Sequence, residues 1–366
     1  MEAVPLLVAV LALSLANGAN DNVKGVATLI GAGRLSRRAG LLYGTAATCL
    51  GSVVAIGLAS GLLARFSGKG LVPAELTAMP LFALCVGIAA AITVLLATRL
   101  GLPISTTHAL VGALTGIGLA SGTLQAGALA GAFVAPLLLS PVAAMALAAA
   151  IYPLLRRARL VAGVSHETCV CVNAQQAVAI GAAGGTAVGS PALRVVVASA
   201  EACAGYRGTV AGVTAQRLLD GAHFLTAGAV SFARGVNDTP KIAALLLLLP
   251  LLGGATPAML AVGAAMAGGG LLLGRRVAKT MSHEITAMND GQAFTANLTT
   301  ASLVLLASYG GLPVSTTHVS CGALFGIGAA RGGARWKMIG RIVGAWGLTL
   351  PLAAVLAAGL WMALER

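Results

Sequence analysis

Four short polar runs in an otherwise apolar chain carry side chains that could bind an oxyanion. Two are nearly identical, Gly101-Leu-Pro-Ile-Ser-Thr-Thr-His108 and Gly311-Leu-Pro-Val-Ser-Thr-Thr-His318. The other two are Gly18-Ala-Asn-Asp-Asn-Val-Lys24 and Gly235-Val-Asn-Asp-Thr-Pro-Lys241. Hydroxyl, amide and ammonium groups can donate hydrogen bonds to an oxyanion. Each half of the chain holds one run of each kind in the same order, which indicates an internal duplication.

The hydroxyl runs predict broken helices. A Pro followed by a hydroxyl residue is a common helix start, and apolar sequence precedes Pro103 and Pro313, so we expect a break there within the membrane. Asp238 and Pro240 similarly predict a cap followed by Pro at the first helical position. The N-terminal ends of such helices favour anions. The substrate-binding candidates are Ser105, Thr106, Thr107, Ser315, Thr316, Thr317, Asn20, Asn237, Lys24 and Lys241.

The two aspartates are the candidates for a coupling ion or a proton. Asp21 and Asp238 follow Asn within apolar sequence, and a carboxylate inside a membrane costs about 2.5 to 3.5 kcal/mol even on insertion scales. Lys24 and Lys241 come three residues later, a spacing that places ammonium and carboxylate on one helical face. The alternative interpretation is a buried ion pair that only fixes helix register.

The remaining polar side chains of the runs also have structural interpretations. A Ser-Thr-Thr run can serve as interhelical hydrogen bonding, worth about 0.6 kcal/mol on average. We expect His108 and His318 to orient their loops by bonding backbone carbonyls, with titration near neutral pH as the alternative.

The composition is that of a membrane protein. Of 366 residues, 58% are hydrophobic and 9% are charged, whereas soluble domains carry about 25% charged residues. The stretches 39–63, 126–155 and 341–363 are long enough to cross a bilayer, and they do not alternate as barrel strands would. We therefore predict an all-α membrane protein with about 10–12 transmembrane segments. The first apolar run lacks a basic flank and is expected to stay as a span rather than to be cleaved.

The charge pattern predicts an inverted repeat. The net charge is +13, but the basic residues fall in short clusters between apolar stretches, which favours the positive-inside rule over binding to nucleic acid. If both termini lie on the outer side of the cell membrane, the basic residues on that side are only Arg65, Lys69 and Arg366. The clusters then placed in the cytoplasm are Arg34, Arg37, Arg38, Arg99, Arg156, Arg157, Arg159, Arg275, Arg276, Lys279, Arg331, Arg335 and Lys337. This topology requires an odd number of crossings in each half.

The chain is predicted to comprise a first transmembrane repeat (1–160), a small cytoplasmic insertion (161–220) and a second repeat (221–366). A β-branched run at 195–197 predicts strand content in the insertion. Zinc is an alternative for its cysteines, but the spacing of the donors is poor, so free thiols are expected and no metal site is assigned. These donors are Cys169, Cys171, Cys203, His166 and Glu167.

The four runs resemble those of the inorganic phosphate transporter (PiT) family. The resemblance covers both halves but not the insertion. It implies an inverted-repeat secondary transporter that carries phosphate with Na⁺ or H⁺, with all four runs lining one central site. Where the family pattern has a second Asn, this chain has Lys24 and Lys241. These lysines are hypothesised to act as built-in counter-ions that lessen Na⁺ dependence, or to exchange protons.

Three rival functions remain open at this point. A sulfate or other tetrahedral oxyanion permease is the nearest, but Asp21 and Asp238 favour phosphate, which carries a proton that a carboxylate can accept. A membrane hydrolase built on Ser, His and Asp is disfavoured because the residues occur in duplicate, so the chain is expected not to be an enzyme. An uncoupled channel is the third.

The expected partners are inorganic phosphate and the lipid bilayer, with Na⁺ or H⁺ as coupling ion and no other cofactor. A homodimer is one option for the assembly.

Overall fold

The computed structural model describes residues 3–165, 167–175, 178–180, 186–188, 192–199, 213–284 and 288–365. These residues form two compact units, one made of residues 1–152 with 224–366 and the other of residues 153–223. The first unit contains most of both predicted repeats, and the second contains the whole of the predicted insertion together with a few flanking residues. The repeat boundaries at 160 and 220 stay predictions.

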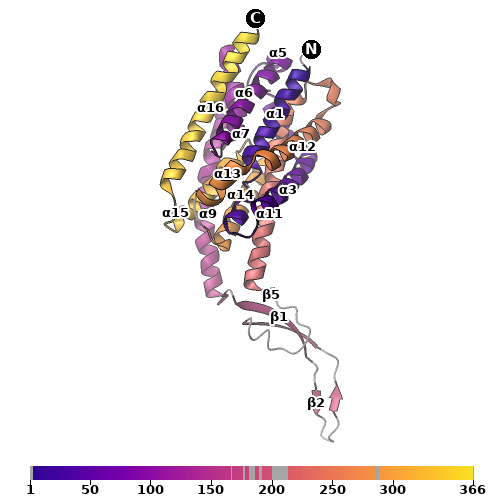
Figure 1. Ribbon diagram of the computed structural model, residues 1–366, viewed down its shortest axis with the longest axis vertical. Coiled ribbons are helices and arrows are strands. Elements are labelled where there is room, and N and C mark those ends of the chain that lie inside the picture. Colours follow the sequence, from indigo (N-terminus) through magenta and orange to yellow (C-terminus); the bar gives the residue numbers. More distant parts are fainter. Residues whose placement is uncertain are drawn as a thin grey trace. The chain divides into compact units, whose positions relative to one another are not determined.

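Helices dominate the first half of the chain (Figure 1). They are α1 (Ala3–Asp21), α2 (Ala27–Gly31), α3 (Arg37–Leu58), α4 (Ser60–Phe66), α5 (Ala74–Thr77), α6 (Pro80–Arg99), α7 (Thr106–Ala120), α8 (Ala126–Ala128), the π-helical η1 (Leu129–Val134) and α9 (Ala135–Val161).

The second half is also helical. Its elements are α11 (Ala215–Ala243), the 3₁₀ turns η2 (Ala244–Leu246) and η3 (Pro250–Leu252), α12 (Ala255–Leu273), α13 (Arg275–Lys279), the π-helical η4 (Thr280–Glu284), α14 (Asp290–Tyr309), α15 (Thr316–Ala330) and α16 (Trp336–Leu364). Figure 1 places both ends of the chain at the same end of the helical unit.

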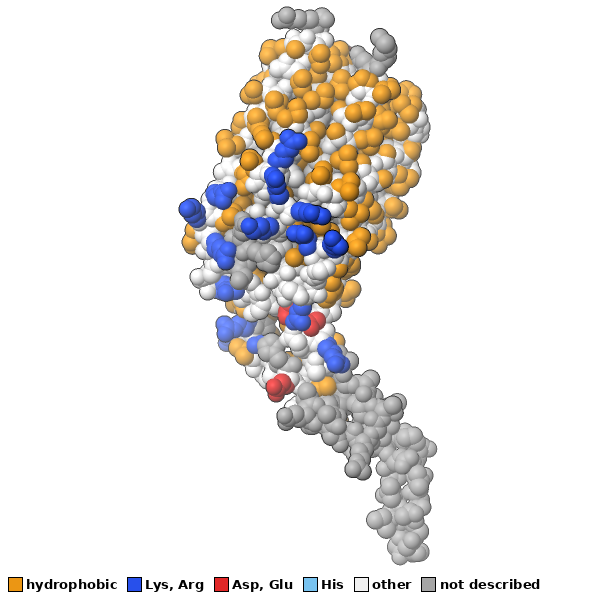
Figure 2. Space-filling view, in the orientation of Figure 1, with side chains coloured by type: hydrophobic (Ala, Val, Ile, Leu, Met, Phe, Trp, Pro, Cys, Tyr) orange, Lys and Arg blue, Asp and Glu red, His pale blue; other side chains and the backbone are white. Residues whose placement is uncertain are grey.

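Within the described residues, six helical segments are long and apolar enough to cross a membrane. They are Ala3–Asp21, Arg37–Leu58, Pro80–Arg99, Ala126–Val161, Ala255–Leu273 and Trp336–Leu364. The helices α7, α11, α14 and α15 are shorter or carry more polar residues. Hydrophobic side chains cover much of the visible surface of the helical unit, and Lys and Arg gather toward one end of it (Figure 2). These observations confirm the predicted helical membrane fold.

Close helix contacts repeat in the two halves. A Cβ atom added at Gly116 in α7 would lie 2.1 Å from the carbonyl oxygen of Ala354 in α16. At the corresponding Gly326 in α15, a Cβ atom would lie 2.2 Å from the carbonyl oxygen of Met145 in α9. Small residues let helix backbones approach this closely, and such packing holds helices together in lipid. Each motif helix therefore packs against a long helix of the other half.

The second unit contains the strands, which confirms the predicted strand content of the insertion. A three-stranded antiparallel sheet has the order β4 (Ala192–Ser199), β1 (Thr168–Gln175), β5 (Val213–Thr214), and its register pairs Val170 with Val197 and with Val213. A separate antiparallel pair joins β2 (Val178–Ile180) to β3 (Thr186–Val188). Among the metal-ligand candidates, His166 and Cys203 lie outside the described residues, as does the side chain of Cys171.

Candidate functional site

The two Asn-Asp runs end their helices differently. In the first half α1 ends at Asp21, and a turn leads to the short α2. In the second half α11 continues through Pro240 to Ala243. The prediction that Asp238 caps a new helix beginning at Pro240 is therefore wrong. Pro240 removes one backbone donor, but packing holds the helix in place: a Cβ atom at Gly235 would lie 2.2 Å from the Thr48 carbonyl oxygen.

The predicted breaks before the hydroxyl runs are confirmed. The helix α6 ends at Arg99, and α7 begins at Thr106 with Ser105 as its N-cap; the backbone N–H of His108 donates to Ser105 Oγ over 3.0 Å. The same arrangement recurs at α15, where the His318 N–H donates to Ser315 Oγ over 3.2 Å. Both serine oxygens thus cap helices. Each helix directs its N-terminal first turn, which favours anions, toward the Asn-Asp runs.

Lys24 connects the two halves. Its ammonium forms an ion pair with Asp21 and donates to the Ile104 carbonyl oxygen over 3.0 Å. It also donates to the hydroxyl of Thr317, which belongs to the other half of the chain. Thr317 Oγ1 in turn donates to the Ile104 carbonyl oxygen over 2.6 Å. Lys24 is therefore not part of a self-contained ion pair.

Lys241 makes the corresponding contacts, with the roles of the two halves exchanged. Its Nζ donates to the Val314 carbonyl oxygen over 2.6 Å and to Thr107 Oγ1 over 3.0 Å, and it lies 4.0 Å from Asp238 Oδ1. Thr107 Oγ1 donates to the Val314 carbonyl oxygen over 3.4 Å. Each lysine thus contacts a carboxylate and a carbonyl of its own half and a threonine of the other half.

The asparagines of the runs hold the broken loops. Asn20 Nδ2 donates to Thr98 Oγ1 and to the Leu102 carbonyl oxygen, both over 3.0 Å, while Asn20 Oδ1 accepts from the Ile104 N–H over 3.1 Å. Asn237 Nδ2 donates to the Val314 carbonyl oxygen over 3.3 Å and to Thr316 Oγ1 over 3.1 Å. The amides therefore fix the loops that carry the hydroxyl runs.

Two further residues of the site were not predicted from the sequence. Asn17 Nδ2 lies 2.9 Å from Thr106 Oγ1, 3.2 Å from Asp21 Oδ2 and 3.4 Å from Asp238 Oδ2, so it links both aspartates. Arg234 Nη2 donates to Asn17 Oδ1 over 2.5 Å, and Arg234 Nε lies 3.5 Å from Asp238 Oδ2. Asn17 and Arg234 each precede the glycine of an Asn-Asp run. Extending the comparison of the runs by one residue would have found them.

The histidines follow the predicted behaviour. His108 Nδ1 lies 3.3 Å from the Trp346 carbonyl oxygen in α16, and His318 Nδ1 lies 3.4 Å from the Leu137 carbonyl oxygen in α9. The carbonyls belong to neighbouring helices, so each imidazole ties its loop to the surrounding bundle. The two rings also contact each other, with centroids 4.3 Å apart.

Residues of each motif loop line a pocket. One, of about 310 Å³, is lined by Gly101, Leu102, Arg276, Lys279 and Arg341 among others. Another, of about 480 Å³, includes Gly131, Leu312 and Val314 and is mainly apolar. Alignment of the two hydroxyl runs pairs Gly101 with Gly311. The same alignment pairs Leu102 with Leu312, and Gly131 with Arg341. Two lining residues of the first pocket thus have counterparts in the second, but the first pocket has cationic side chains that the second lacks.

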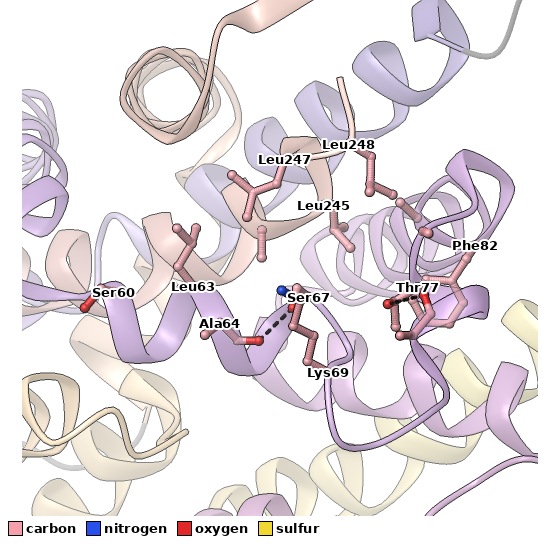
Figure 3. Close-up of a pocket in the computed structure, with 14 residues that line it drawn as sticks. Ser60, Leu63, Ala64, Ser67, Lys69, Thr77, Phe82, Leu245, Leu247 and Leu248 are labelled. Atoms are coloured by element: carbon pink, nitrogen blue, oxygen red, sulfur yellow. Dashed lines mark hydrogen bonds between the residues drawn. The ribbon is translucent and has the colours of Figure 1, made fainter. Parts of the chain in front are cut away.

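A third pocket, of about 460 Å³, lies beyond the end of α11 (Figure 3). Leu245, Leu247 and Leu248 line it together with Leu63 of α4 and Phe82 of α6, and the aliphatic chain of Lys69 lies at its edge. None of the predicted site residues lines this pocket. It is mainly apolar and is not a candidate for oxyanion binding.

The predicted site residues therefore come together from both halves. The threonines, lysines, aspartates and asparagines of all four runs form one connected and buried network. The network offers ammonium, hydroxyl and amide donors next to two carboxylates, and such a set can bind a small oxyanion or a cation.

Comparison with known proteins supports the same conclusion. Residues 17–357 match the model of the family described as "Phosphate transporter family". The chain is 28% identical to a putative phosphate permease of Pyrococcus abyssi over 95% of this chain and 94% of that protein. It is also 28% identical to a probable low-affinity inorganic phosphate transporter of Mycobacterium bovis over 96% of this chain and 75% of that protein.

The fold is also similar to a solved structure. A protein described as "The sodium-dependent phosphate transporter" matches with a TM-score of 0.76 over 100% of this chain and 99% of that one, at 22% sequence identity.

Proposed function

Because the chain belongs to the phosphate transporter family, we propose that it carries inorganic phosphate across the cell membrane by secondary active transport. Family membership confirms the resemblance inferred from the four runs. It also confirms that the chain is a multi-pass membrane transporter and not an enzyme. The relatives in Pyrococcus and Mycobacterium carry names of phosphate permeases or transporters, which supports phosphate as the substrate.

One observation carries the proposal: each buried ammonium contacts a threonine of the other half. Lys24 contacts Thr317, and Lys241 lies 3.0 Å from Thr107 Oγ1. Phosphate binds between the halves, where its oxygens replace these hydroxyls on the ammonium groups or bridge the two. The first turns of α7 and α15 add the positive ends of two helix dipoles.

The arrangement supports alternating access. Because each ammonium is bonded to both halves, movement of one half relative to the other breaks or remakes these contacts. A substrate that bridges the two halves binds more tightly to one arrangement of the halves than to the other. Such a difference in affinity is the condition for a ligand to shift a conformational equilibrium. The inverted repeat and the placement of both termini outside belong to this proposal, and so does coupling to a cation, Na⁺ or H⁺.

The basic pocket gives the pathway a direction. Arg276, Lys279 and Arg341 line it, and its Leu102 carbonyl accepts from Asn20 in the central network. A cluster of positive charge raises the local concentration of anions. By the positive-inside rule this pocket opens to the cytoplasm, and we assign it as the cytoplasmic approach to the site.

Phosphate is preferred over sulfate because acceptors face the site. Asp21 and Asp238 converge on Asn17, and a protonated phosphate oxygen can donate to either carboxylate. Sulfate has no proton at neutral pH and would leave the acceptor unpaired, which costs binding energy.

The test is uptake of radiolabelled phosphate into proteoliposomes that contain the purified protein. We expect saturable uptake, driven by an imposed cation or proton gradient, that excess unlabelled phosphate abolishes and equimolar sulfate leaves largely unchanged. Sulfate uptake equal to phosphate uptake would replace the substrate assignment with the wider class of tetrahedral oxyanions. Uptake that fails to saturate would favour a channel.

A further inference from the structure

The buried charge of this protein is concentrated in one place. Among the residues that the structure describes, the buried Asp, Glu, Lys and Arg side chains are Asp21, Lys24, Arg234, Asp238 and Lys241. Each is at most 4% exposed. All five belong to the central network or contact it directly.

These five groups form a single cluster around Asn17. The amide nitrogen of Asn17 lies within hydrogen-bond distance of both carboxylates, and its oxygen accepts from Arg234. Lys24 pairs with Asp21, and Lys241 lies 4.0 Å from Asp238. Two carboxylates that converge on one point repel each other, so cations must offset them.

The cluster contains one cation more than it contains anions. Two aspartates stand against two lysines and one arginine, which leaves a formal charge of +1. An uncompensated charge is costly in a buried site within a membrane, whereas one phosphate monoanion neutralises the cluster. We propose that Lys24, Lys241 and Arg234 are fixed counter-ions that bind phosphate without Na⁺. This inference rests on the proposed function.

The surroundings of the ammonium groups support this assignment. Lys24 Nζ is held by a carboxylate, a backbone carbonyl and a hydroxyl, from Asp21, Ile104 and Thr317. Lys241 has the corresponding set from Asp238, Val314 and Thr107. Hard cations prefer oxygen ligands such as these, and unwound backbone carbonyls coordinate Na⁺ in transporters. The chain thus fills both positions with covalently attached cations.

Arg234 sets the excess charge and breaks the symmetry of the halves. Its counterpart in the first half is Asn17, which is neutral. Two lysines alone would only balance the two aspartates, so the excess positive charge depends on Arg234. We therefore assign Arg234 as a binding residue that determines the charge of the accepted anion.

The first experiment compares phosphate uptake by the wild-type protein in Na⁺ medium and in choline medium at equal pH and ionic strength. We expect the two rates to agree within about twofold. The double variant Lys24→Asn/Lys241→Asn changes the formal charge of the cluster from +1 to −1. We expect Na⁺ to raise its uptake about tenfold or more, because a cation must now offset the carboxylates.

The second experiment tests Arg234. Arg234→Asn copies the residue of the first half, and we expect the phosphate affinity to fall by about tenfold or more, in line with the loss of a hydrogen-bonded charge. Arg234→Lys keeps the charge and should recover most of the affinity. Arg34→Gln is the control, since it removes a cation that pairs with Asp290 near the surface, and it should leave the phosphate affinity unchanged.

Calorimetric binding of phosphate to the purified wild-type protein in Na⁺-free buffer guards against variants that do not fold. Binding there supports the inference. Phosphate binding or uptake by the wild type that strictly requires Na⁺ overturns it, while the proposed function stands. A wild-type protein that neither binds nor transports phosphate in any medium contradicts the proposed function itself.

Discussion

The imidazole rings of His108 and His318 contact each other at a centroid distance of 4.3 Å and an interplanar angle of 85°. The two residues occupy the same position in the two hydroxyl runs, in the first turns of α7 and α15. Equivalent residues of a duplicated chain can touch only near the axis that relates the two copies. The threonines that precede these histidines therefore lie close to the centre of the molecule, which supports the proposed inverted repeat.

The threonine contacts between the halves predict symmetric effects. Thr107→Val and Thr317→Val each remove a hydroxyl that donates to a phosphate oxygen once phosphate has taken its place on the ammonium, and a hydrogen bond to a charged group is worth about 1.5 to 3 kcal/mol. We expect the KM for phosphate to rise about tenfold or more in either variant. Thr115→Val is the matched control, because its hydroxyl bonds only the Val111 carbonyl of its own helix in the described contacts. Uptake kinetics check this prediction, and a large effect in one variant with none in the other would contradict a shared site.

Removal of one aspartate should cost stability as well as transport. Asp21→Asn leaves the buried ammonium of Lys24 without its carboxylate, and breaking a buried pair costs about 3 to 5 kcal/mol. We expect a lower thermal unfolding temperature and no phosphate uptake. The double variant Asp21→Leu/Lys24→Met should recover much of the stability but not the transport. Thermal unfolding in detergent measures this, and recovery of uptake in the double variant would show that the pair is only structural.

The close contact at Gly116 predicts a packing defect. A larger side chain there meets the Ala354 carbonyl oxygen of α16, so Gly116→Val forces the helices apart at a cost of about 1 to 3 kcal/mol. We expect a lower unfolding temperature and less folded protein in the membrane. Gly344→Val in α16 is the control, since a Cβ atom there meets nothing within 4 Å. Equal stability of the two variants would argue against this helix contact.

The basic pocket predicts a salt-dependent rate. Arg341→Gly gives the pocket the residue found at the corresponding position of the first half. We expect the KM for phosphate, measured from the side to which this pocket opens, to rise severalfold at low ionic strength. The difference from the wild type should shrink near 1 M salt, where the screening length is about 3 Å. Arg38→Gln, an exposed residue that does not line the pocket, is the control. An effect that is independent of salt would indicate a structural role instead.

Local features of the site could be predicted from the sequence because short-range rules govern them. Pro103 and Ser105, like Pro313 and Ser315, specify a helix start, and the caps are present as expected. The rule failed at Pro240, where tight packing of α11 around Gly235 keeps the helix continuous despite the missing donor. Local sequence carries no information about such a neighbour.

The contacts between the halves could not be predicted. The sequence places Lys24 near Asp21, but its bond to Thr317 depends on how two distant halves interlock. Arg234 is different, because it directly precedes the glycine of its run and the sequence alone could have indicated it. Its role becomes visible only when Asn17 is seen to link both aspartates.

The most direct measurement is a cryo-EM structure of the protein in lipid nanodiscs with saturating phosphate. The proposed binding mode predicts tetrahedral density between the first turns of α7 and α15, within hydrogen-bond distance of the Nζ atoms of Lys24 and Lys241. Phosphate density elsewhere would contradict it, for example only in the pocket of Arg276 and Arg341. An unchanged network in a protein that binds phosphate would contradict it as well.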